Sequence, residues 1–350
     1  APNPNLRWER TFDYKVGADI SIFKNRLRFV TEYYYRLSSD VVTPVRVPET
    51  TGFSTQSYNT SKILNRGVEF SLNASIIRKQ DYSLSLSANI SHNRNELKEY
   101  NSPTGNAFGS MRVGYPLNSI FTGDPQGIDR YTGVYIFKPR SDAKFESKND
   151  YLDGDNYLFY IGTSNAPING GYSISGRYKN FTLSIGGVYT FGAKILNEIN
   201  SPASYGTLQK SSPTSERVPT SHNDLYRNHL NVLKSSRYRW TESNPVTDGM
   251  PRLIDAYGPN LGYETYMTTS SIINRGALIE NVSYFKVNSI VLGYNFSEKA
   301  LKGIGIESLG LSFVMNNILT ISNYSGFDPE TPGAVYPQSK SFSFGVNIGF

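Results

Sequence analysis

Strict alternation of apolar and polar side chains closes the sequence, from Ser341 to Phe350. Serine, glycine or asparagine separates the apolar residues, which are Phe342, Phe344, Val346, Ile348 and Phe350. A period of two belongs to a β-strand, because successive side chains point to opposite faces of a sheet. The two faces of this strand therefore meet different media: core and water in a soluble sandwich, or lipid and water in a membrane barrel.

The same pattern opens the chain and returns after a short turn. Mostly apolar residues occupy every second position from Phe12 to Ile22, and again from Leu27 to Leu37 after a predicted turn at 24–26. The charged residues of both segments fall on the opposite face; they are Asp13, Lys15, Asp19, Arg28, Glu32 and Arg36. That face is wet in either architecture, as the solvent side of a sandwich or as the lumen of a large barrel.

Short and long connections alternate along the chain. The alternating segments predict nine strands, with tight turns at 24–26, 78–81 and 179–180, a medium turn at 297–308, and long excursions at 39–64, 95–169, 194–282 and 322–339. Short turns at one end and long loops at the other are the pattern of outer-membrane barrels, whereas a soluble domain rarely carries structureless excursions of such length. Two weaker segments, 117–123 and 133–137, raise the predicted total to between nine and eleven.

Strand parity predicts that the chain is part of a larger barrel. An odd number of strands, whose first and last members run in the same direction, cannot close as an antiparallel barrel. The opening residues, APNPNLRWERTF, lack a charged start followed by an apolar core, so no signal peptide is expected in this sequence.

Composition supports a membrane-embedded all-β protein. The chain has 26 Tyr and 19 Phe, and only 18% of its residues are charged. Tyrosine is stable at the two interfacial girdles of a barrel, where its ring meets lipid and its hydroxyl meets the headgroups. The mean hydropathy is −0.41, and the absence of any apolar run of about 18 residues excludes a helical membrane protein. The net charge is +6, but Lys and Arg are scattered, so nucleic-acid binding is not expected.

A series of motifs resembles one family of transporters along nearly the whole chain. The strings are NPNLRWERTFDYKVGADISIFKNRLRFVTEYYYR (3–36), TGFSTQSYNTSKILNRGVEFSLNA (51–74), GYPLNSIFTGDPQGIDRYTG (114–133), IGTSNAPINGGYSISGRYKNFTLSIGG (161–187), Arg-Trp-x3-Asn-Pro (239–245), NVSYFKVNSIVLGYNF (281–296) and NNILTISNYSGFDPETPG (316–333). Together and in this order they resemble the C-terminal part of SusC-like (SusC/RagA) TonB-linked outer-membrane transporters of Bacteroidetes. The resemblance implies an antiparallel transmembrane β-barrel of about 22 strands with long extracellular loops, of which this chain supplies nine to eleven.

The resemblance also implies a function and partners. Residues 1–350 are expected to form the C-terminal part of one barrel, whose plug and N-terminal strands are absent from the sequence. The expected activity is active import of a large nutrient, an oligosaccharide or a peptide, across the outer membrane of a Gram-negative cell. A SusD-like lipoprotein is expected as the lid, and TonB as the source of energy through the plug. The alternative is a β-rich surface binding protein or adhesin without transport activity.

Candidate contact residues lie in the predicted loops. Aromatic side chains there can stack on a sugar or contact the lid protein, although packing within the loop is the plainer alternative; they are Trp240, Tyr58, Tyr205, Tyr226, Tyr257 and Tyr263. Trp240 is the preferred single candidate. The resemblance implies that the terminal aromatic residue, Phe350, also acts as an assembly signal for barrel insertion.

No catalytic residue, metal site or cofactor is expected. His222 and His229 lie seven positions apart without a third ligand at suitable spacing. Asp153 and Asp155 are interpreted as a structural turn, because the spacing of a calcium loop is not continued. The remaining acidic group, Asp328 with Glu330 in GFDPETPG, is interpreted as turn chemistry.

The alternation makes a direct prediction for two adjacent residues. If Leu86 faces the bilayer near its midplane, Leu86→Arg lowers the free energy of unfolding by about 2–4 kcal/mol, whereas Ser87→Arg, on the wet face, has a small effect. Unfolding of both variants in detergent measures the difference. Equal tolerance of the two arginines contradicts the assignment of the faces.

Overall fold

The computed structural model describes residues 3–101, 111–131, 133, 135–146, 154–197, 240–249, 274–303, 305–334 and 336–350. Within these residues, nine antiparallel strands form one sheet in the order β1-β2-β3-β4-β9-β10-β11-β12-β13. The strands are β1 (Arg10–Ile22), β2 (Leu27–Arg46), β3 (Thr55–Arg78), β4 (Tyr82–Tyr100), β9 (Ile168–Tyr178), β10 (Phe181–Leu196), β11 (Ile279–Asn295), β12 (Ser308–Ser322) and β13 (Ser341–Gly349). The predicted all-β antiparallel architecture is confirmed.

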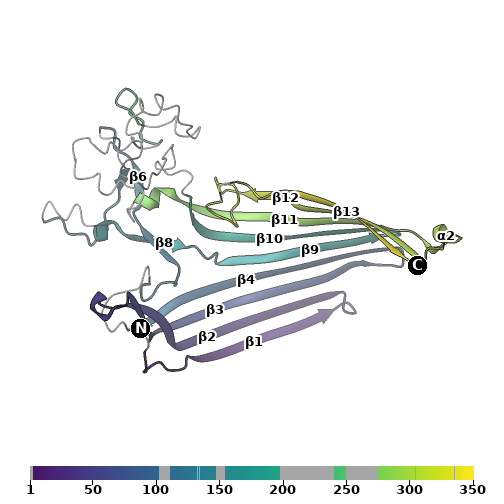
Figure 1. Cartoon of the computed structure of the whole chain (residues 1–350), viewed down its shortest axis with the longest axis horizontal. Helices are drawn as coiled ribbons and strands as arrows, with labels where there is room; N and C mark the ends of the chain where they lie inside the picture. Colours follow the sequence, from purple (N-terminus) through teal and green to yellow (C-terminus); the bar gives the residue numbers. More distant parts are fainter. Residues whose placement is uncertain are drawn as a thin grey trace.

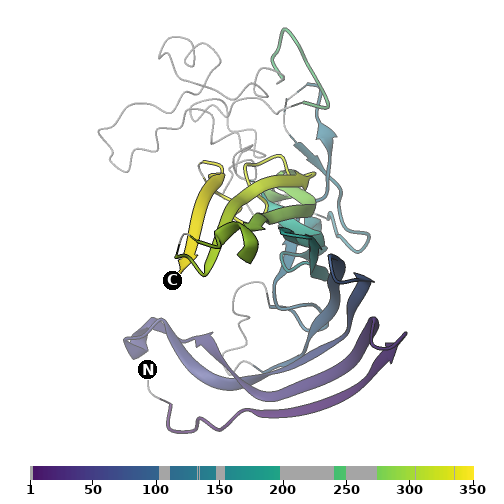
Figure 2. The ribbon, with the colours of Figure 1, turned by 90° about the vertical axis from the view of Figure 1, so that its right-hand side faces the viewer.

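The sheet is long, curved and open. Figure 1 shows the strands running side by side along the long axis of the molecule, and Figure 2 shows the sheet bending into an arc between β1 and β13. Those two strands are the edges of the sheet and do not pair with each other. No helix in the described residues is long and apolar enough to cross a membrane.

The predicted turns are confirmed at one end of the sheet. β1 and β2 are joined by residues 23–26, β3 and β4 by 79–81, and β9 and β10 by 179–180. In the first turn Phe23, Lys24 and Asn25 all have positive φ, between 54° and 61°. The medium connection between β11 and β12 contains the short helix α2 (Glu298–Leu301).

The predicted long loop at 39–64 is wrong. β2 continues to Arg46 and β3 begins at Thr55, so that only residues 47–54, with the one-turn 3-10 helix η1 (Glu49–Thr51), connect them. The extension pairs in regular register except for bulges near Asp40, which has a left-handed φ of 56°. Here the β-branched residues Thr and Val favour extended backbone, but neither face is uniformly apolar, so the sequence lacks the alternation that marks a membrane strand.

The excursion at 95–169 contributes no strand to the main sheet in the residues that are described. The two weak segments do form strands, β5 (Ser119–Thr122) and β7 (Tyr135–Phe137). They pair elsewhere, however, with β8 (Phe159–Thr163) and β6 (Pro125–Ile128), in two separate two-stranded sheets. β4 therefore bonds directly to β9, and the sheet has the lowest of the predicted strand numbers.

One face of the sheet is apolar and exposed. Phe12, Phe342 and Phe344 each expose more than 60% of their surface. Near the short turns the same face carries a hollow of about 620 Å³, whose lining includes the rings of Tyr82, Tyr178 and Phe181. Such exposure is costly in water, and it is what a lipid-facing barrel wall with an aromatic girdle requires.

On this apolar face, β9 and β10 carry two reciprocal tyrosine–glycine pairs. In the antiparallel register Gly170 is opposite Tyr189, and Tyr172 is opposite Gly187. A Cβ atom added to either glycine would lie 2.5 Å from the hydroxyl oxygen of the opposite tyrosine. Each ring therefore lies over a glycine because only glycine leaves the space for it.

Each tyrosine hydroxyl extends past the opposite glycine and contacts the strand beyond it. The Tyr189 hydroxyl donates to the carbonyl of Asn89 on β4 at 2.7 Å, and the Tyr172 hydroxyl donates to the carbonyl of Lys286 on β11 at 3.2 Å. We call this group of two tyrosines and two glycines the Tyr–Gly tie. It links four consecutive strands, β4, β9, β10 and β11.

The Tyr–Gly tie predicts different outcomes at two adjacent glycines. Gly187→Ala places a Cβ atom 2.0 Å from the Lys286 carbonyl oxygen and 2.5 Å from the Tyr172 hydroxyl, which costs about 1–3 kcal/mol of overpacking. Gly186→Ala is the control, because its nearest neighbour would be the Ser289 Oγ at 3.5 Å. Heat-modifiable migration in detergent should show less folded protein for Gly187→Ala alone, and equal amounts for both variants contradict the role of the tie.

Candidate functional site

The polar face of the sheet carries paired charges across β1 and β2. Arg36 Nη2 lies 2.8 Å from Asp13 Oδ2, and Lys15 Nζ lies 3.1 Å from Glu32 Oε1. These side chains are one third to one half exposed, so each pair stabilises the fold by less than about 1 kcal/mol. Their main effect is a hydrophilic surface with balanced charge.

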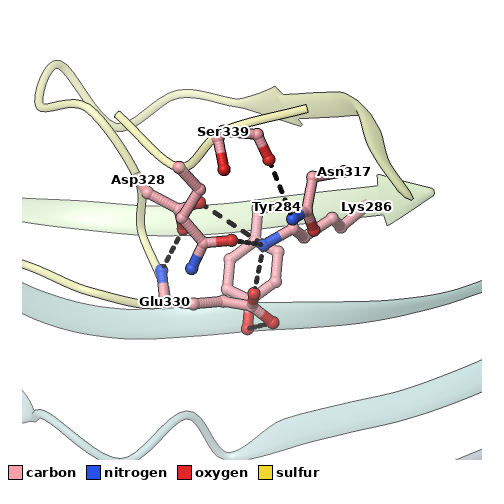
Figure 3. A network of polar contacts seen from close by, with 7 residues as sticks. Tyr284, Lys286, Asn317, Asp328, Glu330 and Ser339 are labelled. Carbon is pink, nitrogen blue, oxygen red and sulfur yellow. Dashed lines mark hydrogen bonds and ion pairs between the residues drawn. The ribbon is translucent and has the colours of Figure 1, made fainter. Parts of the chain in front are cut away.

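A buried ion cluster lies farther round the same face (Figure 3). Lys286 on β11 exposes only 2% of its side chain. Its Nζ lies 3.3 Å from Asp328 Oδ2, contacts Glu330 Oε2, and donates to Gln338 Oε1 at 3.2 Å. One ammonium group thus binds three acceptors that all come from the segment between β12 and β13.

Further hydrogen bonds hold that segment, residues 323–340, against the sheet. The Tyr284 hydroxyl donates to Glu330 Oε1 at 3.4 Å, and Asn317 Nδ2 donates to the Ser339 carbonyl at 3.2 Å. At its start, the amide of Ser325 donates to Glu280 Oε2 at 2.9 Å. The anchored segment, as we call 323–340, is therefore fixed to β11 and β12 near both of its ends.

The turn interpretation of Asp328 and Glu330 is confirmed but incomplete. The Glu330 amide donates to Asp328 Oδ1 at 2.8 Å, and the Thr331 amide donates to the Asp328 carbonyl at 3.2 Å. Lys286 was not among the predicted site residues, and it lies more than forty positions before both carboxylates. The available signal was a single lysine among the mostly uncharged residues of β11.

Trp240 is buried rather than exposed. Its relative exposure is 9%, and its indole nitrogen donates to the Arg130 carbonyl at 2.8 Å. Nearby, the Thr241 amide donates to the Asn244 carbonyl at 3.2 Å. Trp240 therefore packs within the loop region, which was the plainer alternative to contact with a sugar or with the lid protein.

Tyr58 lies on β3, in the strand extension, and not in a loop as predicted. It is partly buried, and its hydroxyl donates to Gln56 Oε1 at 2.5 Å. It borders a polar hollow of about 470 Å³ lined mainly by amide-bearing side chains; the lining residues are Asn3, Asn5, Arg7, Tyr58, Asn59, Thr60 and Asn101. Asparagine amides both donate and accept, so this hollow suits a neutral polar ligand such as a sugar or a peptide amide.

The other candidates are located as follows. Seven of them lie outside the described residues, as does the side chain of Asp155; the seven are Tyr205, Tyr226, Tyr257, Tyr263, His222, His229 and Asp153. Phe350 directly follows β13 and is 84% exposed. Its assembly role stays a prediction.

The fold and its two faces define a class of protein. A curved antiparallel sheet with one exposed apolar face, one hydrophilic face, short turns at one end and long connections at the other is the wall of a transmembrane β-barrel. The chain belongs to the TonB-dependent receptor-like β-barrel family, whose model matches residues 1–188.

Individual relatives extend the match to nearly the whole chain. The chain is 24% identical over 387 residues to TonB-dependent receptor P3 of Formosa agariphila, a match that covers 99% of this chain and 35% of that protein. It is 25% identical over 377 residues to TonB-dependent receptor SusC of Bacteroides thetaiotaomicron, covering 99% of this chain and 32% of that protein. The chain thus spans about a third of the length of these curated relatives.

Solved structures give the same result. The structure of the RagAB peptide transporter matches with a TM-score of 0.79 and 25% identity, over 100% of this chain and 36% of that chain. The RagAB peptide importer in the open-open state matches with a TM-score of 0.75 and 26% identity. The predicted resemblance to SusC-like transporters is confirmed, and the chain is an outer-membrane β-barrel protein.

Family membership assigns the two faces. The apolar face meets the lipid and the polar face lines the lumen, so the Lys286 cluster holds the anchored segment inside the barrel. The end with the short turns is periplasmic and the end with the long connections is extracellular.

Lys286→Met tests the buried cluster. The variant leaves the carboxylates of Asp328 and Glu330 without their cation, and losing one partner of a buried ion pair costs about 3–5 kcal/mol. We expect faster limited proteolysis within the anchored segment in detergent and a lower unfolding midpoint. Lys15→Met, which removes one partner of an exposed pair, is the control, and equal behaviour of the two variants contradicts the assignment.

Proposed function

We propose that this chain forms part of the wall of an active importer of large nutrients in the outer membrane, energised through TonB. The observation that carries the proposal is the match to the RagAB peptide transporter, at a TM-score of 0.79 and 25% identity across the whole chain. Membership of the TonB-dependent receptor-like family supports it independently.

In this proposal, residues 1–350 are the C-terminal portion of one larger barrel. The outer side of each edge strand, β1 and β13, pairs with no strand in the described part of the chain. Unpaired backbone groups are costly in lipid, so a membrane wall must close through further strands. Those strands, and a plug that contacts TonB, belong to the remainder of the same transporter.

The partner proposed for the extracellular end is a SusD-like lipoprotein that acts as a lid. The support is the likeness of the chain to SusC and to RagAB. The small sheets β5–β8 and β6–β7 lie at the end of the strands opposite the short turns (Figure 1), where they add surface beyond the membrane. Purification of the complete transporter should therefore yield a stoichiometric lipoprotein, and a transporter that imports without one contradicts the lid.

The proposed cargo is an oligosaccharide or a peptide. The hollow beside Tyr58 has asparagine amides and an aromatic ring, a combination that can hydrogen-bond and stack on either class. We propose Tyr58 as a ligand contact. The further proposed contacts to ligand or lid are Tyr205, Tyr226, Tyr257 and Tyr263.

Uptake by cells tests the transport function. A strain that lacks the complete transporter should lose growth on its cargo, and complementation should restore growth only while TonB is present. Growth that is restored without TonB contradicts the proposal, as does a complete transporter whose loss leaves uptake of oligosaccharides and peptides unchanged.

Tyr58→Ala tests the proposed ligand contact. Removing one ring from a binding site costs about 1–2 kcal/mol of affinity, so the concentration for half-maximal uptake should rise about five- to thirtyfold. The control is Tyr131→Ala, because Tyr131 is 88% exposed and does not line the hollow. Unchanged uptake by Tyr58→Ala, at normal levels of folded protein, removes Tyr58 from the site while leaving the transport function untouched.

A further inference from the structure

Two arginines face each other on the lipid-facing side of the wall. Arg66 on β3 is directly opposite Arg94 on β4. In this uninterrupted part of the register they share a face with the apolar pair Phe70 and Ile90. Like charges directly opposite each other destabilise a sheet, so this arrangement calls for an anion.

Neither arginine has a carboxylate partner within ion-pair distance among the described residues. Arg10, Arg28 and Arg36, by contrast, each bind an aspartate. The acidic residue that follows Arg94 on the same face of β4 is Glu96, and its Oε1 is bound to Lys98 Nζ at 2.6 Å. Among the described residues, this group has three cations and one carboxylate, so positive charge is left uncompensated.

The arginine pair lies at the extracellular boundary of the lipid. From Val68 to Ile77, β3 has the roughly ten residues with which a tilted strand crosses the hydrocarbon layer. Arg66 is the next residue of the lipid-facing row beyond Val68, on the side of the long connections. Its guanidinium is therefore at the depth of the outer headgroups.

A cleft beside Arg94 offers room for a headgroup. It opens above the last paired residues of β4 and β9, His92 and Ile168, and has a volume of about 960 Å³. Among the described residues, its lining includes Arg94, His92, Tyr115 and Tyr160, together with several asparagines and Thr190 of the lumen face, and contains no Asp or Glu. The two tyrosine rings are 4.9 Å apart, and such rings can cover the apolar face of a sugar.

We propose that Arg66 and Arg94 bind a phosphate group of a glycolipid headgroup in the outer leaflet, and that the cleft beside Arg94 holds its sugar. A guanidinium donates paired hydrogen bonds to phosphate oxygens. The phosphate also neutralises the two facing cations. This proposal requires only that the sheet lies in the outer membrane. It does not depend on which cargo is transported or on how transport is energised.

The test uses the complete transporter purified in detergent, with and without bisphosphorylated lipid A. The lipid should raise the thermal midpoint of the wild type, and Arg66→Gln/Arg94→Gln should lose at least half of that increase. Arg28→Gln/Arg36→Gln, on the lumen face, is the matched control and should keep the full increase. Without lipid, the Arg66/Arg94 variant should melt no earlier than the wild type, because the facing charges are gone.

Three results overturn the proposal: no increase in the wild type, an equal increase in the Arg66/Arg94 variant, or the same increase from inorganic phosphate alone, which indicates a site for soluble anions. If the double variant does not fold, Arg94→Gln alone carries the test, because Arg94 is exposed and its replacement creates no cavity. The single variant should then lose part of the increase, and an unchanged increase rejects the site.

Discussion

Hydrogen bonding between neighbouring strands is the constraint on which this structure depends. Lipid offers no partner for a backbone N–H or C=O group, so every strand that crosses it must be paired on both sides. The nine strands pair in a continuous antiparallel ladder from β1 to β13, and the outer sides of these two edge strands require further strands. The side chains are then free to divide by face: apolar groups on the lipid side, and paired charges and serines on the lumen side.

That division explains what could be predicted from the sequence. Between Phe12 and Ile22, or between Ser341 and Phe350, every residue meets one of two very different media, and the sequence records this as alternation. Beyond the membrane, both faces of the sheet meet water. The extension of β2 to Arg46 and the start of β3 at Thr55 therefore carry no such record, and the polar composition there led to a wrong prediction of a loop.

The Lys286 cluster was harder to predict because its residues contact one another from distant positions in the sequence. Lys286 joins Asp328 through a side-chain contact over 42 positions, and each residue has an unremarkable local explanation of its own. The aromatic candidates show the same limit. Composition selects tyrosine and tryptophan as groups capable of stacking, but burial separates Trp240, which packs within the protein, from Tyr58, which borders a hollow.

The Tyr–Gly tie has a consequence for how the wall is assembled. A strand that slips by one residue turns its apolar side chains into the lumen, so alternation alone rejects that error. A slip by two residues keeps every side chain on its proper face, and alternation cannot detect it. Between β9 and β10 such a slip would move both tyrosine rings off their glycines together, in either direction. The two reciprocal tyrosine–glycine pairs thus specify the register of β9 against β10. They favour one alignment among those that differ by two residues and place the same side chains in lipid.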